Sequence, residues 1–377
     1  MSISRHRNKR RKHLRYIAAR ANVPFGLHAR HLLEDTCNMF LSSYSVQIAT
    51  LYDIWTDKHG FDAAKDLYDK IGRIGVVRTL GRFRPSPVPF FHKERSTGGY
   101  RKLCIFSETS LMWQRMAAAL VHAQHKPGHH IGDWPKRGGH QQVDAIAQAI
   151  QTPWQYVVTA DIKHCFQSVE FDAVYELPHL SEAFVRKVLD HRSMTFKQHD
   201  VSAKPLRVHE GATYHFERAP TGLLEGSPAS NAIFSVLMDD LPSQFNKHIS
   251  VFVYCDNIIL LAPDEIQVLQ ARDVLVRYLA GHRAGPFECR IEVQSVNQPF
   301  EHLGYQIVRR HDGRVSVGLS DRNWKKLNYR IQVDESNLED VSQWLFASFP
   351  QCTMEKVQGY VQLMLDEAYS RASTAMP

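Results

Sequence analysis

Residues 251–261 read VFVYCDNIILL, and this stretch predicts the central element of the fold. Segments 251–254 and 257–262 consist mainly of β-branched, aromatic and aliphatic residues, so both are predicted to be largely buried strands. Cys255 and Asp256 would form the tight turn between them, because Asp and Asn tolerate the left-handed backbone angles of a two-residue turn. The stretch therefore predicts a buried β-hairpin with an acidic residue at its tip.

A second acidic residue ends a similar apolar strand, YVVTAD at residues 156–161. A single Asp in a turn usually serves only the turn, but two strand-borne acids can act together. If the two strands are neighbours, they lie about 4.8 Å apart. The carboxylates of Asp161 and Asp256 could then share divalent ions held roughly 3.5–4 Å from each other. This pair predicts a metal site for phosphoryl transfer on nucleotides.

The composition limits the class of protein. A chain of 377 residues is expected to form two or three subdomains. The formal charge of +7 and the pI near 9.0 favour a polyanionic partner. Six scattered cysteines without a C-x-x-C pair indicate reduced thiols rather than disulfides or a zinc site. No apolar run reaches the roughly 18 residues of a membrane span, and no secretory signal is present, so we expect a cytoplasmic protein without membrane contact.

The N-terminus, MSISRHRNKRRKHLR, is strongly basic and contains no acidic residue. Its seven cations are Arg5, Arg7, Lys9, Arg10, Arg11, Lys12 and Arg15. Such a run is ordinarily a solvated, mobile tail. The alternative is an arm that binds the phosphates of RNA or DNA, and the motifs described below favour this arm.

Hydrophobic periodicity predicts the remaining elements. Helices are expected over 28–72, 108–124, 140–151, 172–191, 228–240 and 263–281, strands over 288–296 and 300–309, and mainly helices over 321–377. Residues 92–106 are predicted to form a hairpin that carries Lys93, Arg101 and Lys102. This hairpin is either an exposed charged surface or a basic flap over a triphosphate.

Phe166 lies five residues after Asp161, where its side chain could face the same cleft. The carbonyl of Ile162 could add a metal ligand. A bulky ring beneath the sugar of a nucleotide would clash with a 2′-hydroxyl and favour deoxynucleotides. Taken alone, Phe166 is also a reasonable core residue.

The segment GLLEGSP at residues 222–228 leads into a predicted helix. Ser227 is a suitable N-cap, and Pro228 occupies the first helical position that proline prefers. Gly222 and Gly226 free the backbone to approach a ligand closely. Glycine-rich turns begin many ordinary helices, but they also provide sites for a phosphate or a base pair.

Taken in order, five short motifs form a series. They are YRKL at 100–103, DIKHCF at 161–166, GLLEGSP at 222–228, FVYCDN at 252–257 and HLGY at 302–305. The series resembles the ordered motifs of reverse transcriptases, especially bacterial ones of the group II intron, retron and phage-defence types. The resemblance covers about residues 85–310, and Gly132 to His140 is similar to the segment that precedes the first catalytic strand in that family.

The resemblance implies an α+β right-hand polymerase. A basic arm and helical region (1–84) would precede the fingers (85–155), a palm built on a β-α-β-β-α-β sheet (156–310) and a helical thumb (311–377). It also implies the substrates and partners: dNTPs, an RNA template and a DNA product. A stand-alone enzyme of this kind resembles polymerases that work with a non-coding RNA in antiviral defence. A protein partner or an oligomer is compatible with the resemblance.

The resemblance assigns roles to single residues. Asp161 and Asp256, with the Ile162 carbonyl and with Asn257 beside them, would bind two Mg²⁺ ions, with Mn²⁺ as an alternative. Nucleotide binding is implied for Lys93, Arg101, Lys102, Phe166, Gly222, Glu225, Gly226 and Ser227. A grip on the primer strand is implied for Leu303, Gly304 and Tyr305.

Two departures concern the catalytic groups. The family usually ends its hairpin with Asp-Asp, whereas Asn257 stands second here; an amide oxygen can still accept or ligate. No lysine stands in 281–299, where the family often places a proton donor. Arg290 and His282 are the candidates to replace it.

A third departure replaces the Pro-Gln of the family's glycine turn by Leu224-Glu225. An ionised carboxylate accepts hydrogen bonds from cytosine or adenine but cannot donate. One hypothesis is that Glu225 reads or replaces a base and so restricts template use. The simpler interpretation, which we prefer, is a tolerated substitution.

Two other functions compete with reverse transcription. An RNA-directed RNA polymerase is compatible with the Asp-Asn hairpin. A catalytically degraded RNA-binding scaffold is compatible with Asn257 and Glu225. Comparing dNTP with NTP incorporation separates these functions, and Phe166 favours dNTPs.

Overall fold

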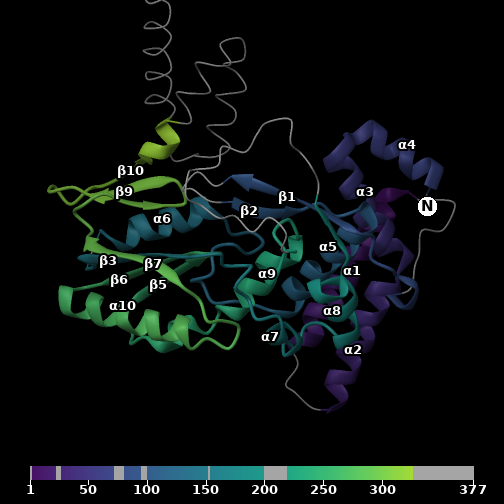
Figure 1. Cartoon of the computed structure of the whole chain (residues 1–377), viewed down its shortest axis with the longest axis horizontal. Helices are drawn as coiled ribbons and strands as arrows, with labels where there is room; N and C mark the ends of the chain where they lie inside the picture. The colour runs from purple at the N-terminus through teal and green to yellow at the C-terminus, as the bar shows by residue number, and fades with distance from the viewer. Residues whose placement is uncertain are drawn as a thin grey trace, which may run out of the picture. The chain divides into compact units, whose positions relative to one another are not determined.

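A computed structural model describes residues 2–22, 27–71, 80–94, 100–151, 153–198 and 219–325. The chain divides into two compact units. Unit 1 comprises Met1–Pro135, Ile162–Leu241 and Val276–Cys289, and unit 2 comprises Lys136–Asp161, Pro242–Leu275 and Arg290–Pro377. Figure 1 shows the elements of both units.

The first part of unit 1 is helical. Its helices are α1 (Ile3–Ala21), α2 (Leu27–Ser42), α3 (Tyr44–His59), α4 (Phe61–Ile71) and α5 (Glu108–Gln124). Helix α3 is buried on nearly all sides of its first three turns, which is typical of a core helix, and α1 packs against α2, α3 and α5. The helical expectation for 28–72 is therefore confirmed, except that three helices share the range and residue 72 lies outside the described residues.

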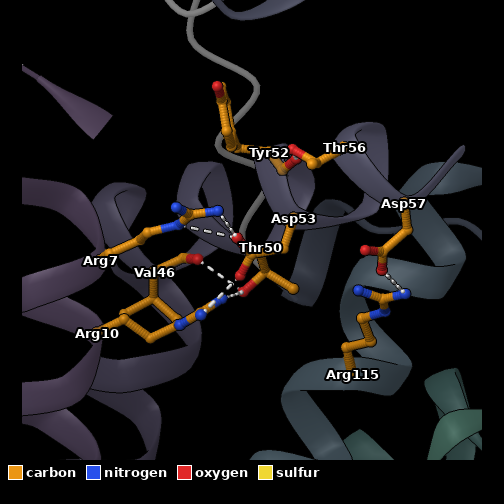
Figure 2. Close-up of polar contacts among 9 residues, drawn as sticks. All are labelled: Arg7, Arg10, Val46, Thr50, Tyr52, Asp53, Thr56, Asp57 and Arg115. Atoms are coloured by element: carbon orange, nitrogen blue, oxygen red, sulfur yellow. Dashed lines mark hydrogen bonds and ion pairs between the residues drawn. The ribbon is translucent and has the colours of Figure 1, made fainter. Parts of the chain in front are cut away.

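The basic N-terminus, for which a phosphate-binding arm is favoured over a mobile tail, forms the packed helix α1. Arg7 donates from Nε to Oδ1 of Asp53 at 2.9 Å, and Nη2 of Arg10 lies 2.7 Å from Oδ2 of the same carboxylate (Figure 2). His6 is buried, with Nδ1 3.1 Å from Oγ of Ser45. Asp53 on α3 thus pairs with two of the cations, and these contacts hold the helix in place.

Unit 1 also contains a small sheet in the order β2-β1-β4. It is formed by β1 (Val88–Glu94), β2 (Tyr100–Cys104) and β4 (Phe196–Gln198), with β1 antiparallel to β2 and parallel to β4. The predicted basic hairpin is confirmed as two paired strands, and its turn at 95–99 lies outside the described residues. Leu224 packs with Val88, Phe90, Cys104 and Phe106.

Three further helices belong to this unit. The expected helix over 172–191 is split into α7 (Asp172–Tyr175) and α8 (Glu182–Val188), followed by a 3₁₀ turn at His191–Ser193. Pro178 lies in the break, where it cannot donate a helical hydrogen bond. Helix α9 (Pro228–Leu237) begins as predicted: Oγ of Ser227 accepts from the Ala229 amide at 3.2 Å, and proline occupies the first turn.

Unit 2 is built on a four-stranded sheet in the order β5-β6-β3-β7. The strands are β3 (Tyr156–Ile162), β5 (Ser250–Tyr254), β6 (Asn257–Ala262) and β7 (Cys289–Ser295). Helix α9 precedes β5 in the chain, and α10 (Glu265–Ala280) connects β6 to β7. The elements β3, α9, β5, β6, α10 and β7 thus follow the β-α-β-β-α-β order expected from the sequence, with α7, α8 and β4 inserted between β3 and α9. The expected strand at 288–296 is confirmed as β7.

Helix α6 (Gly139–Ala149) joins this sheet to a second one in the order β10-β9-β8. Val143 and Ile146 of α6 pack with Val157, Ile259 and Tyr305 in one buried cluster. The strands of the second sheet are β8 (Phe300–His302), β9 (Tyr305–Arg309) and β10 (Val315–Leu319).

Strand β10 falls within the range expected to form a helical thumb. Its apolar side chains at 315, 317 and 319 alternate with small or polar ones, which is the period of a strand, and it pairs with β9 along its whole length. Residues 326–377, the larger part of the expected thumb, lie outside the described residues. Across the described ranges, no helix combines the length and apolarity needed to cross a membrane.

Candidate active site

The hairpin at 251–261 has the predicted form. Strands β5 and β6 are antiparallel, and Tyr254 is paired with Asn257 across the turn Cys255-Asp256. The left-handed conformation falls on Cys255, with φ +50°, rather than on the acidic residue that follows it. Because a left-handed backbone is unfavourable for a side chain such as cysteine, the flanking strand pairs hold the turn in this form.

Asp161 stands directly opposite Asn257 in the antiparallel pairing of β3 with β6. Residues directly opposite each other project from the same face of a sheet, with Cβ atoms about 4.5–5.5 Å apart. Asp256 is the next residue toward the turn. Strands β3 and β6 are therefore neighbours in one sheet, as expected, with Asp161 on β3 and Asp256 in the turn that directly precedes β6.

The same face forms an open pocket of about 430 Å³. Asp161 and Asn257 line this pocket together with Arg290, Glu292 and His302. Arg290 donates from Nη2 to Oε1 of Glu292 at 2.7 Å. One cation is thus held by a neighbouring acid within the pocket that contains Asp161.

Helix α6 connects the hairpin to the segment at 302–305. Nε2 of Gln142 donates to the carbonyl of Val253 in β5 at 2.9 Å, and Oε1 of Gln142 lies 3.0 Å from Nε2 of His302. Complete burial lowers the pKa of His302 to about 3, so the ring is neutral and Nε2 donates to the amide oxygen. Nδ1 of His140 lies 2.6 Å from the hydroxyl oxygen of Tyr305.

The turn between β8 and β9 consists of Leu303 and Gly304, with φ values of +51° and +82°. Positive φ at both positions is characteristic of a type I′ hairpin turn. A Cβ on Gly139 of α6 would lie 3.0 Å from Cδ1 of Leu303 and 3.9 Å from the ring of Tyr254. The expected primer-grip turn and the catalytic hairpin therefore meet the N-terminus of α6. Sequence reasoning did not identify Gln142 and His302 as connecting residues, and a polar Gln within the apolar face of α6 was the signal for them.

The basic residues of unit 1 do not all share one face. Lys93 and Arg101 are opposite each other in the pairing of β1 with β2, so they project from the same side. Lys102 points to the other side, where Nζ lies 3.4 Å from the carbonyl oxygen of Ala219. Two of the three expected phosphate ligands are therefore neighbours, and the third is directed away from them.

The glycines of the 222–228 turn approach the protein's own backbone. A Cβ on Gly222, at φ +63°, would lie 2.2 Å from the carbonyl oxygen of Phe166, and one on Gly226, at φ +98°, would lie 2.4 Å from that of Cys104. The Cys104 amide in turn donates to the Glu225 carbonyl at 2.8 Å. The turn is therefore fastened to β2 and to the loop after β3, which brings Arg101, Phe166 and Glu225 together in unit 1.

The side chains of this group have protein partners. The ring of Phe166 is half-buried and meets Phe234 edge-to-face at 5.9 Å. Oε2 of Glu225 lies 3.8 Å from Nε of Arg101, and only 11% of the Glu225 side chain is exposed. The carboxylate therefore faces a cation of the protein, which supports the simpler interpretation of this substitution.

A family model described as "Reverse transcriptase (RNA-dependent DNA polymerase)" matches residues 92–307, more than half of the 377 residues. The chain belongs to the reverse transcriptase family. Members of this family are RNA-directed DNA polymerases, a class of nucleotidyltransferase.

Several solved structures are similar to this chain. The apo telomerase of Candida tropicalis, truncated from its C-terminal domain, is 12% identical with a TM-score of 0.39, and the match covers 62% of this chain and 56% of that one. The telomerase of Candida albicans with the TWJ fragment of telomeric RNA is 11% identical (TM-score 0.37; 71% and 54% covered). The BmCPV RNA-dependent RNA polymerase at its elongation state is 12% identical (TM-score 0.45; 86% and 31% covered). The chain thus spans about half the length of these telomerase chains. No curated protein matches the sequence.

The residues present fit the divalent metal that the family generally uses. Within the described part of the chain, no cluster of three or more His, Cys, Asp or Glu residues could hold a metal ion. Mg²⁺ in nucleotide-processing enzymes does not require such a cluster, because one or two carboxylates, substrate phosphates and water complete its shell. Asp161 at the end of β3 and Asp256 in the turn before β6 provide two carboxylates, with the Asn257 amide beside Asp256.

The two candidates for a proton donor in this reverse transcriptase differ. His282 is buried in unit 1, with Nε2 3.1 Å from the Leu237 carbonyl oxygen and Nδ1 accepting from the Ala284 amide at 3.1 Å. Its ring therefore has an internal structural role. Arg290, in contrast, lines the pocket that contains Asp161.

Proposed function

We propose that this reverse transcriptase adds deoxynucleotides to a 3′-hydroxyl under the direction of an RNA template. The observation that carries the proposal is the direct pairing of Asp161 with Asn257, next to Asp256. A carboxylate on β3 and a second one in the turn that begins the neighbouring strand β6 suit the metal-assisted transfer of a nucleotidyl group. The family match to residues 92–307 supports the same chemistry.

In the proposed reaction, the 3′-oxygen of the primer attacks the α-phosphorus of the dNTP, and the bond from that phosphorus to the β-phosphate oxygen breaks to release pyrophosphate. Asp161 and Asp256 would hold Mg²⁺, which when bound supplies activation of the hydroxyl and stabilisation of the leaving charge. Asn257 orients the Asp256 carboxylate through its hydrogen bond. Ile162, the last residue of β3, would offer its carbonyl as a further ligand.

Other residues would bind the substrates. Lys93 and Arg101 suit a triphosphate because both are cationic and share one side of the β1–β2 hairpin. Phe166 would exclude a 2′-hydroxyl from the sugar site, and the turn from Gly222 to Ser227 would lie against the nascent base pair. Leu303, Gly304 and Tyr305 would hold the primer strand.

The decisive experiment measures dNTP incorporation on a primed RNA template with Mg²⁺. We expect Asp161→Ala and Asp256→Ala each to lower the rate on the order of 10²–10³-fold, as removal of a principal electrostatic stabiliser does. Asp144→Ala, which removes an exposed acid from α6 of the same unit, should leave the rate unchanged. Full activity of both active-site variants would refute the proposed site.

The nucleotide preference tests the rival polymerase. We expect dNTPs to be preferred over NTPs, and Phe166→Ala to raise NTP use more than it changes dNTP use. A wild-type preference for NTPs would instead identify an RNA-directed RNA polymerase. Salt-sensitive RNA binding without incorporation of either nucleotide would identify the scaffold.

We further propose that the enzyme works with a structured non-coding RNA in bacterial antiviral defence, as the stand-alone enzymes that its motifs resemble do. The net charge of +7 is compatible with such a partner. Sequencing the nucleic acid that co-purifies with the protein tests this role: one enriched structured RNA is expected, and random cellular RNA would contradict it. The same RNA tests the role of Glu225. The sequences of the products that the wild type and Glu225→Gln make with and without that RNA show whether this residue alters template use.

A further inference from the structure

A groove of about 590 Å³ runs between α1 and α2 of unit 1. It is lined from α1 by Lys9, Lys12, His13, Tyr16 and Arg20, and from the other side by Thr36, Met39, Ser43 and Ser45. No acidic residue is among these lining residues. The groove is therefore complementary to an anion, and its volume is in the range of sites that hold a drug-sized molecule, about 300–1,000 Å³.

The cations of helix α1 form two groups: some pair with α3, and others are exposed to solvent. Arg7 and Arg10 face α3, where both reach Asp53 (Figure 2). Arg5, Lys9, Arg11, Lys12 and Arg15 remain exposed. Since the helix is anchored, these exposed cations stand at fixed positions, which lowers the entropic cost of binding a ligand.

Only part of the exposed charge faces the groove. With 3.6 residues per turn, Lys9, Lys12 and Tyr16 follow one another along one side of the helix, and all three line the groove. Arg11 and Arg15 lie further around the helix and do not line it. The chain thus contains two matched pairs of exposed cations, one inside the groove and one outside.

The groove also presents apolar side chains to solvent. Tyr16 is 52% exposed and Met39 is 60% exposed. Nζ of Lys12 lies 5.8 Å from the centre of the Tyr16 ring. Sites for single-stranded nucleic acid combine cations that contact the phosphates with an aromatic ring on which a base stacks. Neither an acidic peptide nor a duplex needs the exposed ring, because a duplex keeps its base faces covered.

The opposite wall is held in place by Arg20. Its Nη1 donates to the Leu32 carbonyl at 3.2 Å and also to Oγ1 of Thr36. Arg20 therefore connects α1 to α2 at one end of the groove. Burial, and to a smaller extent the charges of Lys12 and Lys9, lower the pKa of His13.

We propose that the α1–α2 groove binds a single-stranded segment of nucleic acid, with one base stacked on Tyr16 and the adjoining phosphates on Lys9 and Lys12. This site would hold the strand independently of nucleotide incorporation, and it requires no residue of the proposed active site. It gives the basic N-terminus a defined binding surface in place of an extended arm.

The test measures equilibrium binding of a fluorescent single-stranded RNA oligonucleotide to the full chain, without dNTP and with EDTA, over a range of salt concentrations. We expect Lys9→Gln/Lys12→Gln to weaken binding about tenfold and to lower the slope of log K against log salt by about 1.4, since each phosphate contact on a single strand contributes about 0.7. The matched variant Arg11→Gln/Arg15→Gln should change the affinity less than twofold. Equal losses in the two variants would overturn the groove and leave only a diffuse basic surface.

Two substitutions of Tyr16 test the stacking contact. We expect Tyr16→Leu to weaken binding at least fivefold with an unchanged salt slope, which corresponds to a stacking contribution of about 1 kcal/mol or more. Tyr16→Phe keeps the ring and should bind like the wild type. Because Tyr16 is exposed, both variants should fold, and circular dichroism checks this. Wild-type affinity of Tyr16→Leu would refute stacking.

Competitors identify the ligand class. Unlabelled single-stranded RNA and DNA should displace the probe, and the stronger of the two identifies the natural strand. Polyglutamate or duplex RNA that displaced it as effectively would overturn the proposal. Asp161→Ala should bind the probe like the wild type. An active polymerase whose groove variants bind normally would refute this inference alone, whereas an inactive one with the expected groove effects would refute only the proposed function.

Discussion

Asn257 donates a hydrogen bond from Nδ2 to Oδ1 of Asp256 at 2.9 Å. The residue that departs from the family's usual Asp-Asp pair thus orients the remaining acid. An aspartate at 257 could not donate this bond when ionised, and it would add a like charge beside Asp256. Asn in place of Asp at position 257 thus removes one negative charge from the hairpin and fixes the orientation of the Asp256 carboxylate.

The hydrogen bond from Asn257 to Asp256 predicts different effects for two substitutions at position 257. Asn257→Ala should lower dNTP incorporation about tenfold, by analogy with the loss of one hydrogen bond to a charged group, about 1.5–3 kcal/mol. Asn257→Asp should remain active and reach half-maximal rate at a lower Mg²⁺ concentration, because a further carboxylate attracts the cation. The measurement is the rate as a function of Mg²⁺ concentration. Wild-type rates for Asn257→Ala at every concentration would show that the hydrogen bond has no role.

Gln142 holds the hairpin and the 302–305 turn together through its amide. Gln142→Leu would leave the Val253 carbonyl and the His302 ring without this partner, at a cost of roughly 1–3 kcal/mol for each buried group. We expect a lower free energy of unfolding in urea, together with a reduced rate of incorporation. Gln141→Leu at the neighbouring exposed position is the matched control. Equal stability of the two variants would contradict the connecting role.

Buried histidines predict that acid destabilises the fold. Burial lowers the pKa of His302 to about 3, and those of His122 and His179 to about 4. Since the unfolded chain binds these protons near pH 6.5, it holds more protons than the folded chain as the pH falls from about 6.5 toward 4. The free energy of unfolding should therefore decrease in this window by about 1.4 kcal/mol per pH unit for each histidine.

His302→Gln tests the contribution of one ring, because its amide can still donate to Gln142. We expect the slope of unfolding free energy against pH between about 6 and 4.5 to fall by nearly 1.4 kcal/mol per pH unit, which corresponds to one bound proton. His129→Gln changes an exposed histidine of the loop before α6 and should leave the slope as it is. An unchanged slope in His302→Gln would show that the ring is accessible to protons in the folded state.

The turn glycines predict a difference between two substitutions that share a left-handed backbone. Gly222→Ala would place a Cβ 2.2 Å from the Phe166 carbonyl oxygen, whereas Gly60, at φ +82°, has nothing within 4 Å of such an atom. Gly60→Ala should cost about 1–3 kcal/mol from the backbone conformation alone, because φ +82° with ψ 171° lies in a region that is essentially restricted to glycine. Gly222→Ala should cost a further 1–3 kcal/mol, roughly, because the backbone must shift. Urea unfolding of both variants measures the difference, and equal losses would mean that the turn is free to move.

Much of the local structure followed from the sequence. The hairpin at 251–261, the helix at 108–124 and the cap at Ser227 were predictable, because alternation, helical periodicity and capping depend on residues a few positions apart. The pairing of β3 with β6 was also expected, since both strands are apolar and each ends near an acid. The ordered motifs were sufficient to identify the family, and Asp161 and Asp256 stay the predicted metal ligands.

Only the tertiary structure decided which partners the polar residues have. Arg7 and Arg10 meet Asp53 more than forty positions away, so a run of cations that resembles a tail becomes a packed helix with a groove. Gly222 and Gly226 serve the chain's own backbone, Glu225 faces Arg101, and Gln142 connects two hairpins. Hydrogen bonds and ion pairs between distant residues leave no periodic pattern in a sequence, because they depend on where the apolar core places each element.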